Sequence, residues 1–271
     1  MTTTWTQNRA TWPKRIERAA ELAERNPWAG EVLSFYRRIL AFQRELYERG
    51  ESSKQPDPAI GADLRTSLDL DRAAASFTGL LSLARSHGPA RLAEEATRLR
   101  DLSPAEIRSL LQQFLATPDP PHDTESFFAR ILLQPEAERL AQTREPQAQG
   151  VAGNRCPNCG ARPQLAVLRP EGDGGKRILL CSLCQSEWEF RRVLCPACGE
   201  VDHQKLPRYT PEANPAVRVE ACDTCKSYLK SVDLTVDGLA VPVVDEIATA
   251  PLDLWAAERD YRKIELNVMG F

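Results

Sequence analysis

The chain has 271 residues, 42% of them hydrophobic, and a mean hydropathy of −0.41, values that are ordinary for a globular protein in water. Its 35 Lys and Arg face 38 Asp and Glu, a net charge of −3 with neither half basic, which argues against nucleic acid as the main ligand. The sequence has no run of about eighteen apolar residues and no secretory signal pattern, so we expect no membrane insertion and a cytoplasmic protein.

The N-terminal 150 residues are predicted to form an all-helical domain, because apolar residues recur there at helical spacing. The predicted helices cover residues 13–25, 28–50, 70–88, 89–101, 105–116, 124–133 and 135–144. Gly50 is expected to cap the second helix, and Ser103 with Glu106 forms a capping box. Proline disrupts helix interiors, so Pro135 is expected to divide the last helical stretch in two.

The C-terminal part, residues 151–271, is predicted to be a second domain of short strands, built from modules over 152–190 and 191–271. Residues 145–153, "EPQAQGVAG", are small and polar and indicate a linker before it. Alternating or β-branched segments between turn signals predict strands over 164–169, 177–181, 187–195, 217–222 and 227–236. The second module is expected to end in a helix over residues 245–263.

All eight cysteines lie in this second part, and every one belongs to a Cys-x-x-Cys pair. The pairs are Cys156/Cys159, Cys181/Cys184, Cys195/Cys198 and Cys222/Cys225. Without a secretion signal disulfides are disfavoured, and two such pairs can complete a tetrahedral site of four sulfurs. The sequence therefore predicts two metal ions per chain, either zinc or iron, because thiolates accept both.

The gaps between the pairs indicate which pairs share an ion. There are 21 residues between Cys159 and Cys181 and 23 between Cys198 and Cys222, and each gap is long enough for a β-hairpin. We therefore expect pairing in chain order, as in zinc-ribbon or rubredoxin-like modules, with an interleaved cross-brace as the alternative. Glycine follows the first and third pairs and supplies a positive φ just after the second ligand.

The segment between the two inner pairs carries Glu187, Trp188, Arg191 and Arg192. Trp188 is expected to pack between the two modules, because small ribbons have little core of their own. Four thiolates around a divalent ion carry a formal charge of about −2, which Arg191 and Arg192 can compensate. Alternatively, this segment contacts a partner protein, since a segment fixed at both ends loses little entropy on binding.

No catalytic constellation is visible in the sequence. His87, His122 and His203 are scattered, and four sulfurs around each ion leave no open position for water or substrate, so we expect no enzyme. Two other functions stay open. Iron in place of zinc would suit a rubredoxin-like electron carrier. A zinc-ribbon nucleic-acid-binding protein is the other, although the near-neutral charge counts against it.

Several segments resemble the FdhE family, the formate dehydrogenase accessory proteins. They are "NPWAGEVLSFYRRILAFQ", "CPNCGARP", "LLCSLCQSEWEFRRVLCPACG", "EACDTCKSYLK" and "DEIATAPLDLWAAERDYRKIELN". The resemblance covers nearly the whole chain and is strongest over residues 156–262. Its pattern C-x-x-C-x-x-E-W-x-x-x-R-x-x-C-P-x-C-G includes Glu187, Trp188 and Arg192 and is far more specific than one Cys-x-x-Cys pair.

The resemblance implies an α+β protein, with a helical N-terminal domain, two tandem rubredoxin-like modules and a C-terminal helix. It also implies a role in the maturation of a molybdenum- or tungsten-dependent formate dehydrogenase. The partner is then the catalytic subunit of that enzyme, bound in the cytoplasm, before export where the enzyme is exported.

Overall fold

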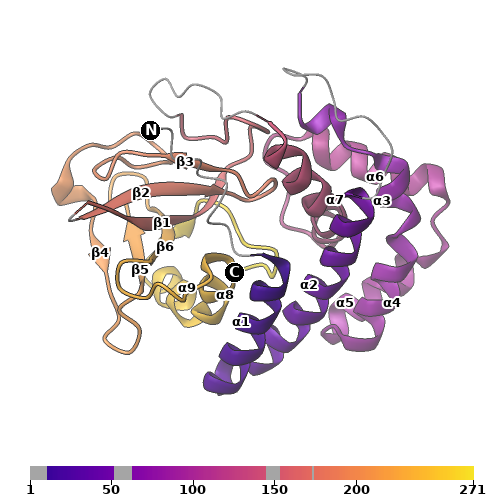
Figure 1. Ribbon diagram of the computed structural model, residues 1–271, viewed down its shortest axis with the longest axis horizontal. Helices are drawn as coiled ribbons and strands as arrows, with labels where there is room; N and C mark the ends of the chain where they lie inside the picture. Colours follow the sequence, from indigo (N-terminus) through magenta and orange to yellow (C-terminus); the bar gives the residue numbers. More distant parts are fainter. Residues whose placement is uncertain (1–10, 52–62, 145–152, 173) are drawn as a thin grey trace.

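The computed structural model describes residues 11–51, 63–144, 153–172 and 174–271, so the predicted linker lies outside the described residues except for Gly153. The helices of the first half pack beside a sheet formed by the second half (Figure 1). Two C-terminal helices lie on the sheet, on the side that faces the helical unit. Within these ranges, no helix has the length and apolar character that a membrane span requires.

The helical unit contains the predicted helices, but it divides them differently at Ser76 and at Pro135. Its helices are α1 (Trp12–Arg25), α2 (Gly30–Glu51), α3 (Leu70–Ala75), α4 (Phe77–His87), α5 (Ala90–Arg98), α6 (Pro104–Ala116) and α7 (Thr124–Gln142). The stretch predicted as one helix over 70–88 divides at Ser76. The capping box of Ser103 and Glu106 is confirmed. Gly50 lies inside the last turn of α2, where a Cβ atom would come within 2.9 Å of a carboxylate oxygen of Glu136.

The predicted break at Pro135 is wrong, because α7 continues through this residue. Proline has no N–H to donate to the carbonyl of Ile131, four residues earlier in the helix. The side-chain amide of Gln43, on α2, donates to that carbonyl instead, at 3.2 Å. A side chain from another helix therefore replaces the missing helical hydrogen bond.

The second half forms one sheet. Its strands are β1 (Pro163–Glu171), β2 (Gly174–Cys181), β3 (Glu187–Glu189), β4 (Arg208–Tyr209), β5 (Val217–Ala221), β6 (Ser227–Asp233) and β7 (Arg262–Lys263). They lie in the order β3-β2-β1-β6-β5-β4, with β7 beside β6. The antiparallel strands β1 and β2 place Leu165 opposite Leu180, whereas the parallel strands β1 and β6 place Ala166 opposite Ser231. The two predicted modules are thus joined through β1 and β6.

The single helix predicted over 245–263 is replaced by α8 (Pro242–Ala248), α9 (Ala250–Ala257) and strand β7. The chain leaves the helical conformation at Thr249, two residues before Pro251. The Thr249 hydroxyl donates to the carbonyl of Asp245, and the ammonium of Lys230 donates to the carbonyl of Glu246 at 2.5 Å. Side chains thus bond carbonyls at the end of α8, where the backbone no longer provides donors.

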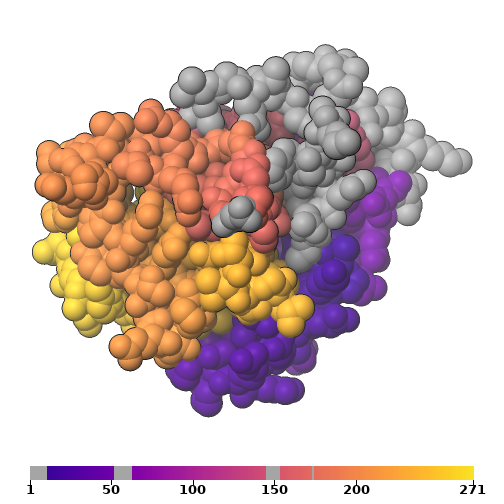
Figure 2. Space-filling model, turned by 60° about the vertical axis from the view of Figure 1, so that its left-hand side comes forward, coloured from indigo at the N-terminus to yellow at the C-terminus, as the bar shows by residue number. Residues whose placement is uncertain are grey.

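The helical unit and the sheet share a hydrophobic core, in which residues of α2 and α7 pack with residues of β1, β2 and α8. Ion pairs also cross the boundary. Arg18 on α1 pairs with Asp245 on α8 at 2.6 Å, and Arg130 on α7 pairs with Glu265 at 2.5 Å, all four side chains being buried. Figure 2 shows the orange and gold C-terminal segments lying directly against the indigo helices. The domain division at residue 150 stays a prediction, but the two parts are closely packed.

Candidate metal centres

The eight sulfur atoms gather in two groups of four, and in each group they all lie within 4.8 Å of one another. The first group contains Cys156, Cys159, Cys181 and Cys184, and the second contains Cys195, Cys198, Cys222 and Cys225. The grouping follows chain order, as the gap lengths predict, and not the interleaved alternative.

Sulfur–sulfur distances fit one tetrahedral ion in each group. Metal–sulfur bonds of about 2.3 Å place tetrahedral sulfurs about 3.8 Å apart. In the first group the distances are 3.5 Å for Cys156–Cys184 and 3.3 Å for Cys159–Cys181. In the second group they are 3.8 Å for Cys195–Cys225 and 3.7 Å for Cys198–Cys222. Four converging thiols at these distances suit zinc or iron.

All four Cys-x-x-Cys pairs share one local turn. The N–H of each leading cysteine donates to the carbonyl five residues later, at 2.9 Å, as in Cys156 to Ala161 and Cys195 to Glu200. The residue after the second cysteine has a positive φ in every pair. Glycine fills that position in the first and third pairs, as the sequence predicts. Gln185 and Lys226, both with φ 55°, fill it in the other two.

The first group is buried and tied to the helical unit. Its four cysteines are at most 5% exposed and belong to the main hydrophobic core. Arg65, which precedes α3, donates from Nε to the carbonyl of Cys159 at 2.7 Å. Gln134 on α7 donates to the carbonyl of Ser182, between Cys181 and Cys184, at 3.1 Å. Helices from the first half therefore hold both turns of this group.

The second group lies closer to solvent. Cys198 is exposed and Cys225 is half-buried, whereas Cys195 and Cys222 are buried. Its two turns are linked to each other by a hydrogen bond of 2.6 Å from the hydroxyl of Thr224 to the carboxylate of Glu200. This group is therefore held by contacts within its own module.

Two arginines beside the first group, Arg155 and Arg162, share one carboxylate and leave one positive charge in excess. Arg155 donates to the carbonyl of Gly160 at 3.1 Å and pairs with Asp119 at 2.8 Å. Arg162 pairs with the same carboxylate. The hydrogen bond from Arg155 lowers the pKa of Asp119. The sequence predicts charge compensation only by Arg191 and Arg192. The carboxylate that positions Arg155 and Arg162 lies 36 and 43 residues away from them, so no local pattern indicates this arrangement.

The segment between the groups is partly buried. The Glu187 carboxylate, 6% exposed, pairs with Arg169 at 2.5 Å. Trp188 is 2% exposed, and its indole N–H donates to the carbonyl of Gly153. Trp188 lies on β3, whereas the two modules meet strand to strand at β1 and β6. Contrary to the prediction from the sequence, the modules therefore do not depend on Trp188 for their contact. Arg191 and Arg192 are exposed.

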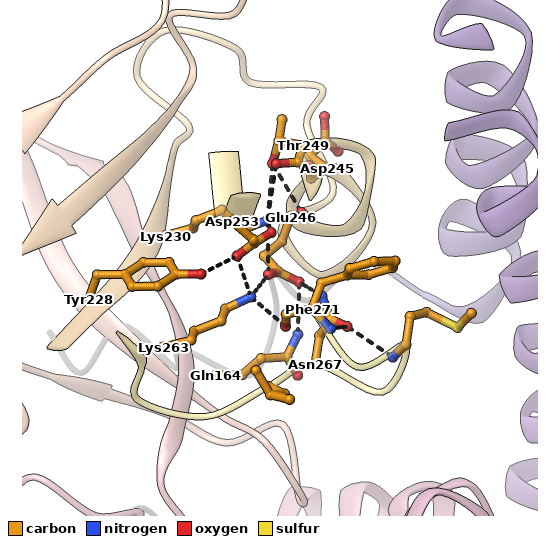
Figure 3. Close-up of polar contacts among 12 residues, drawn as sticks. Gln164, Tyr228, Lys230, Asp245, Glu246, Thr249, Asp253, Lys263, Asn267 and Phe271 are labelled. Carbon is orange, nitrogen blue, oxygen red and sulfur yellow. Dashed lines mark hydrogen bonds and ion pairs between the residues drawn. The ribbon is translucent and has the colours of Figure 1, made fainter. Parts of the chain in front are cut away.

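A buried ionic cluster fixes the C-terminal segment beside the sheet (Figure 3). Lys230, fully buried on β6, donates to Asp253 at 2.5 Å and pairs with Glu246 at 3.2 Å. Lys263 pairs with Glu246 as well, and Asn267 donates to the same carboxylate at 2.6 Å. Burial lowers the pKa of Lys230, and the carboxylates oppose that shift. No sequence signal marked Lys230, since a lysine in an alternating strand is typical of a solvent-facing position.

Chemically, both groups are closed sites. Within the described residues, the two candidate metal groups consist of cysteine alone, and His87, His122 and His203 belong to neither. Four sulfurs satisfy a tetrahedral ion and leave no position for a substrate. The arrangement suits a structural ion or, with iron, one-electron chemistry.

Comparisons with known proteins give one consistent answer. Family models match as the FdhE central domain over residues 155–192 and the FdhE C-terminal domain over residues 190–269. A protein of Aquifex aeolicus (strain VF5) named "Protein FdhE homolog" is 29% identical, covering 94% of both chains. A second protein of that name, from Shewanella baltica (strain OS223), is 28% identical, and the match covers 95% of this chain and 84% of that protein.

A solved structure extends the likeness to the helical unit. It is the crystal structure of the FdhE protein from Pseudomonas aeruginosa, with a TM-score of 0.67 and 26% sequence identity. The match covers 95% of both chains. The similarity thus includes the helices that hold the first cysteine group as well as the two groups themselves.

Proposed function

This chain belongs to the FdhE family, and we propose that it is an accessory protein in the maturation of a molybdenum- or tungsten-dependent formate dehydrogenase. In this role it binds the catalytic subunit of that enzyme in the cytoplasm and is itself no enzyme. The observation that carries the proposal is the match to an FdhE protein over 95% of both chains, helical unit included. Two closed four-cysteine sites fit a binding protein, because neither offers a position for substrate.

A gene deletion tests the proposed role. In an organism with this gene and a formate dehydrogenase, the deletion strain is expected to make the catalytic subunit but to lose formate dehydrogenase activity. The intact gene, supplied on a plasmid, restores the activity. Normal activity in the deletion strain would contradict a role in maturation.

We propose that Arg191 and Arg192 contribute to the surface that binds the catalytic subunit. Both side chains are exposed. Their backbone is held, because Arg177 donates to the carbonyl of Arg191 at 3.0 Å and Arg208 donates to the carbonyl of Arg192 at 2.9 Å. A backbone that is already fixed loses little further entropy on binding, and the two positive charges favour a complementary acidic surface. Glu187 and Trp188 support this segment from within and contribute indirectly.

The chain offers a matched control for this surface. Arg37 and Arg38 on α2 are also adjacent, exposed arginines, but they lie in the helical unit. Arg191→Gln with Arg192→Gln is expected to abolish capture of the catalytic subunit from cytosol while metal content and thermal melting stay normal. Arg37→Gln with Arg38→Gln is expected to leave capture intact. The opposite pattern would move the docking surface to the helical unit and leave Arg191 and Arg192 only a charge-compensating role.

A further inference from the structure

We propose that the two metal sites differ in function: the first holds its ion permanently, and the second is an exchange site. The second site opens at Cys198 and Cys225 to thiophilic divalent cations, chelators and thiol reagents. The inference rests on burial and anchoring alone, so it holds whether or not the protein serves a formate dehydrogenase.

The first group is more enclosed than the second. Cys181 and Cys184 are fully buried, and all four cysteines pack into the core that the sheet shares with α2 and α7. The anchors from Arg65 and Gln134 end on the backbone of its two turns. Gln134 is held in turn by Gln43, whose amide donates to its side-chain oxygen at 3.0 Å. Moving Cys181 or Cys184 away from an ion therefore disturbs the core that the sheet shares with the helical unit.

The second group can open locally. Cys198 is exposed, as are its neighbours Ala197 and Gly199, so reagents in solvent reach this sulfur without movement of a core element. In the part of the chain that the structure describes, the hydrogen bonds of this group's turns run to other residues of its own module. None of its four cysteines belongs to a hydrophobic core cluster among those residues. Opening this site therefore disturbs only the turns themselves.

Ligand exchange at the second group follows from this geometry. Cys198 can leave the ion and take a proton from water, while Cys195, Cys222 and Cys225 remain bound. The vacated position accepts one donor atom from water, a chelator or another protein's thiol. Cys225, which is half-buried, would be displaced next in the same way. Release would be complete only when the chelator has also replaced Cys195 and Cys222, so that four bonds to the chelator replace four metal–sulfur bonds.

The test uses the full chain loaded with two zinc ions and a chromophoric chelator in excess. We expect two phases of one ion each, with the second at least roughly tenfold slower than the first, because it disturbs the shared core. In a parallel experiment, a substoichiometric maleimide is expected to label peptides that contain Cys198 and Cys225 first. Release of both ions at one rate, or first labelling at Cys156, Cys159, Cys181 or Cys184, would overturn the proposal.

Two variants assign the phases to sites. Cys198→Ser is expected to accelerate the fast phase at least roughly tenfold and leave the slow phase unchanged. Gln134→Met removes one anchor of the first group, so it is expected to accelerate only the slow phase. Thr224→Val is the control for Gln134→Met, because it removes a tie within the second module and should not change the slow phase. A slow phase that responds to Cys198→Ser or ignores Gln134→Met contradicts the assignment.

Discussion

Gln43 donates a hydrogen bond from α2 to the carbonyl of Ile131 on α7, the acceptor that Pro135 leaves without its helical donor. The same amide reaches Gln134, whose own amide reaches Ser182 in the first cysteine group. A buried chain of side-chain amides thus runs from α2 through α7 to the first metal site. Buried polar groups are costly unless paired, so each link stabilises this arrangement.

Replacement of Gln43 by Leu is expected to lower the free energy of unfolding by about 1–3 kcal/mol, because it leaves buried acceptors unpaired. Pro135→Ala provides the matched background, since the alanine N–H can donate to Ile131 in place of Gln43. In that background, the cost of Gln43→Leu should fall by about 1 kcal/mol. Denaturant titrations of the four proteins measure this coupling, and strictly additive effects would show that Gln43 does not compensate for Pro135.

The metal groups were predictable from sequence because their signals are local. Each pair needs only a tight turn of a few residues, and Gly160 and Gly199 mark two of the four turns directly. The gap lengths then restrict the pairing. Short alternating segments likewise located β1, β2, β5 and β6, since strand periodicity is a property of neighbouring residues.

The remaining features depend on partners far away in the sequence. Pro135 was expected to break a helix, and only Gln43, about ninety residues earlier, explains why it does not. Lys230 and Arg130 are buried charges whose carboxylate partners come from the C-terminal segment. Nothing in the local pattern around these residues indicates burial, so tertiary packing decided their positions.

Elemental analysis of protein purified without oxygen is expected to find two metal ions per chain. The physical reason is that both groups offer four thiols at distances that suit a tetrahedral ion. X-ray absorption spectroscopy should find sulfur ligands alone, at about 2.3 Å. One ion per chain, or nitrogen and oxygen ligands at either site, would contradict two closed four-sulfur centres.

Replacement of Cys156 and Cys159 by serine is expected to cause aggregation or loss of the cooperative unfolding transition. These residues lie in the shared core, and metal binding of about 10–16 kcal/mol is coupled to folding in small zinc modules. The matched variant replaces Cys195 and Cys198, outside that core, and should retain the helical unit and the first metal ion. Circular dichroism and metal content distinguish the two. A folded Cys156/Cys159 variant that only loses a redox signal would contradict a structural role.

Acid stability is expected to depend on Glu220, which lies on β5 between Arg177 at 2.7 Å and Arg218 at 3.5 Å. Burial raises the pKa of Glu220, but the two guanidinium groups outweigh it and hold the pKa below its ordinary value of 4.5. A lowered carboxylate pKa adds stability that is present above the ordinary value and lost as the pH falls through the folded value. Below about pH 4.5, wild type should therefore lose stability faster than Glu220→Gln.

Glu220→Gln itself is expected to be less stable than wild type at pH 7, because it leaves the buried Arg177 without its counter-ion. Glu220 lies two residues before Cys222, so the metal content of both proteins is measured at each pH to separate the two effects. Urea unfolding at pH 7 and pH 4 measures both effects. Equal losses of stability in the two proteins would show that Glu220 does not contribute to acid sensitivity.

Calorimetric titration of the purified protein with the catalytic subunit of formate dehydrogenase measures the proposed binding. With both metal sites filled, we expect saturable binding at a fixed stoichiometry. Arg191→Gln with Arg192→Gln should weaken that binding at least roughly tenfold, and Arg37→Gln with Arg38→Gln should not. Absence of saturable binding between the folded, metal-loaded protein and the catalytic subunit would contradict the proposed role in maturation.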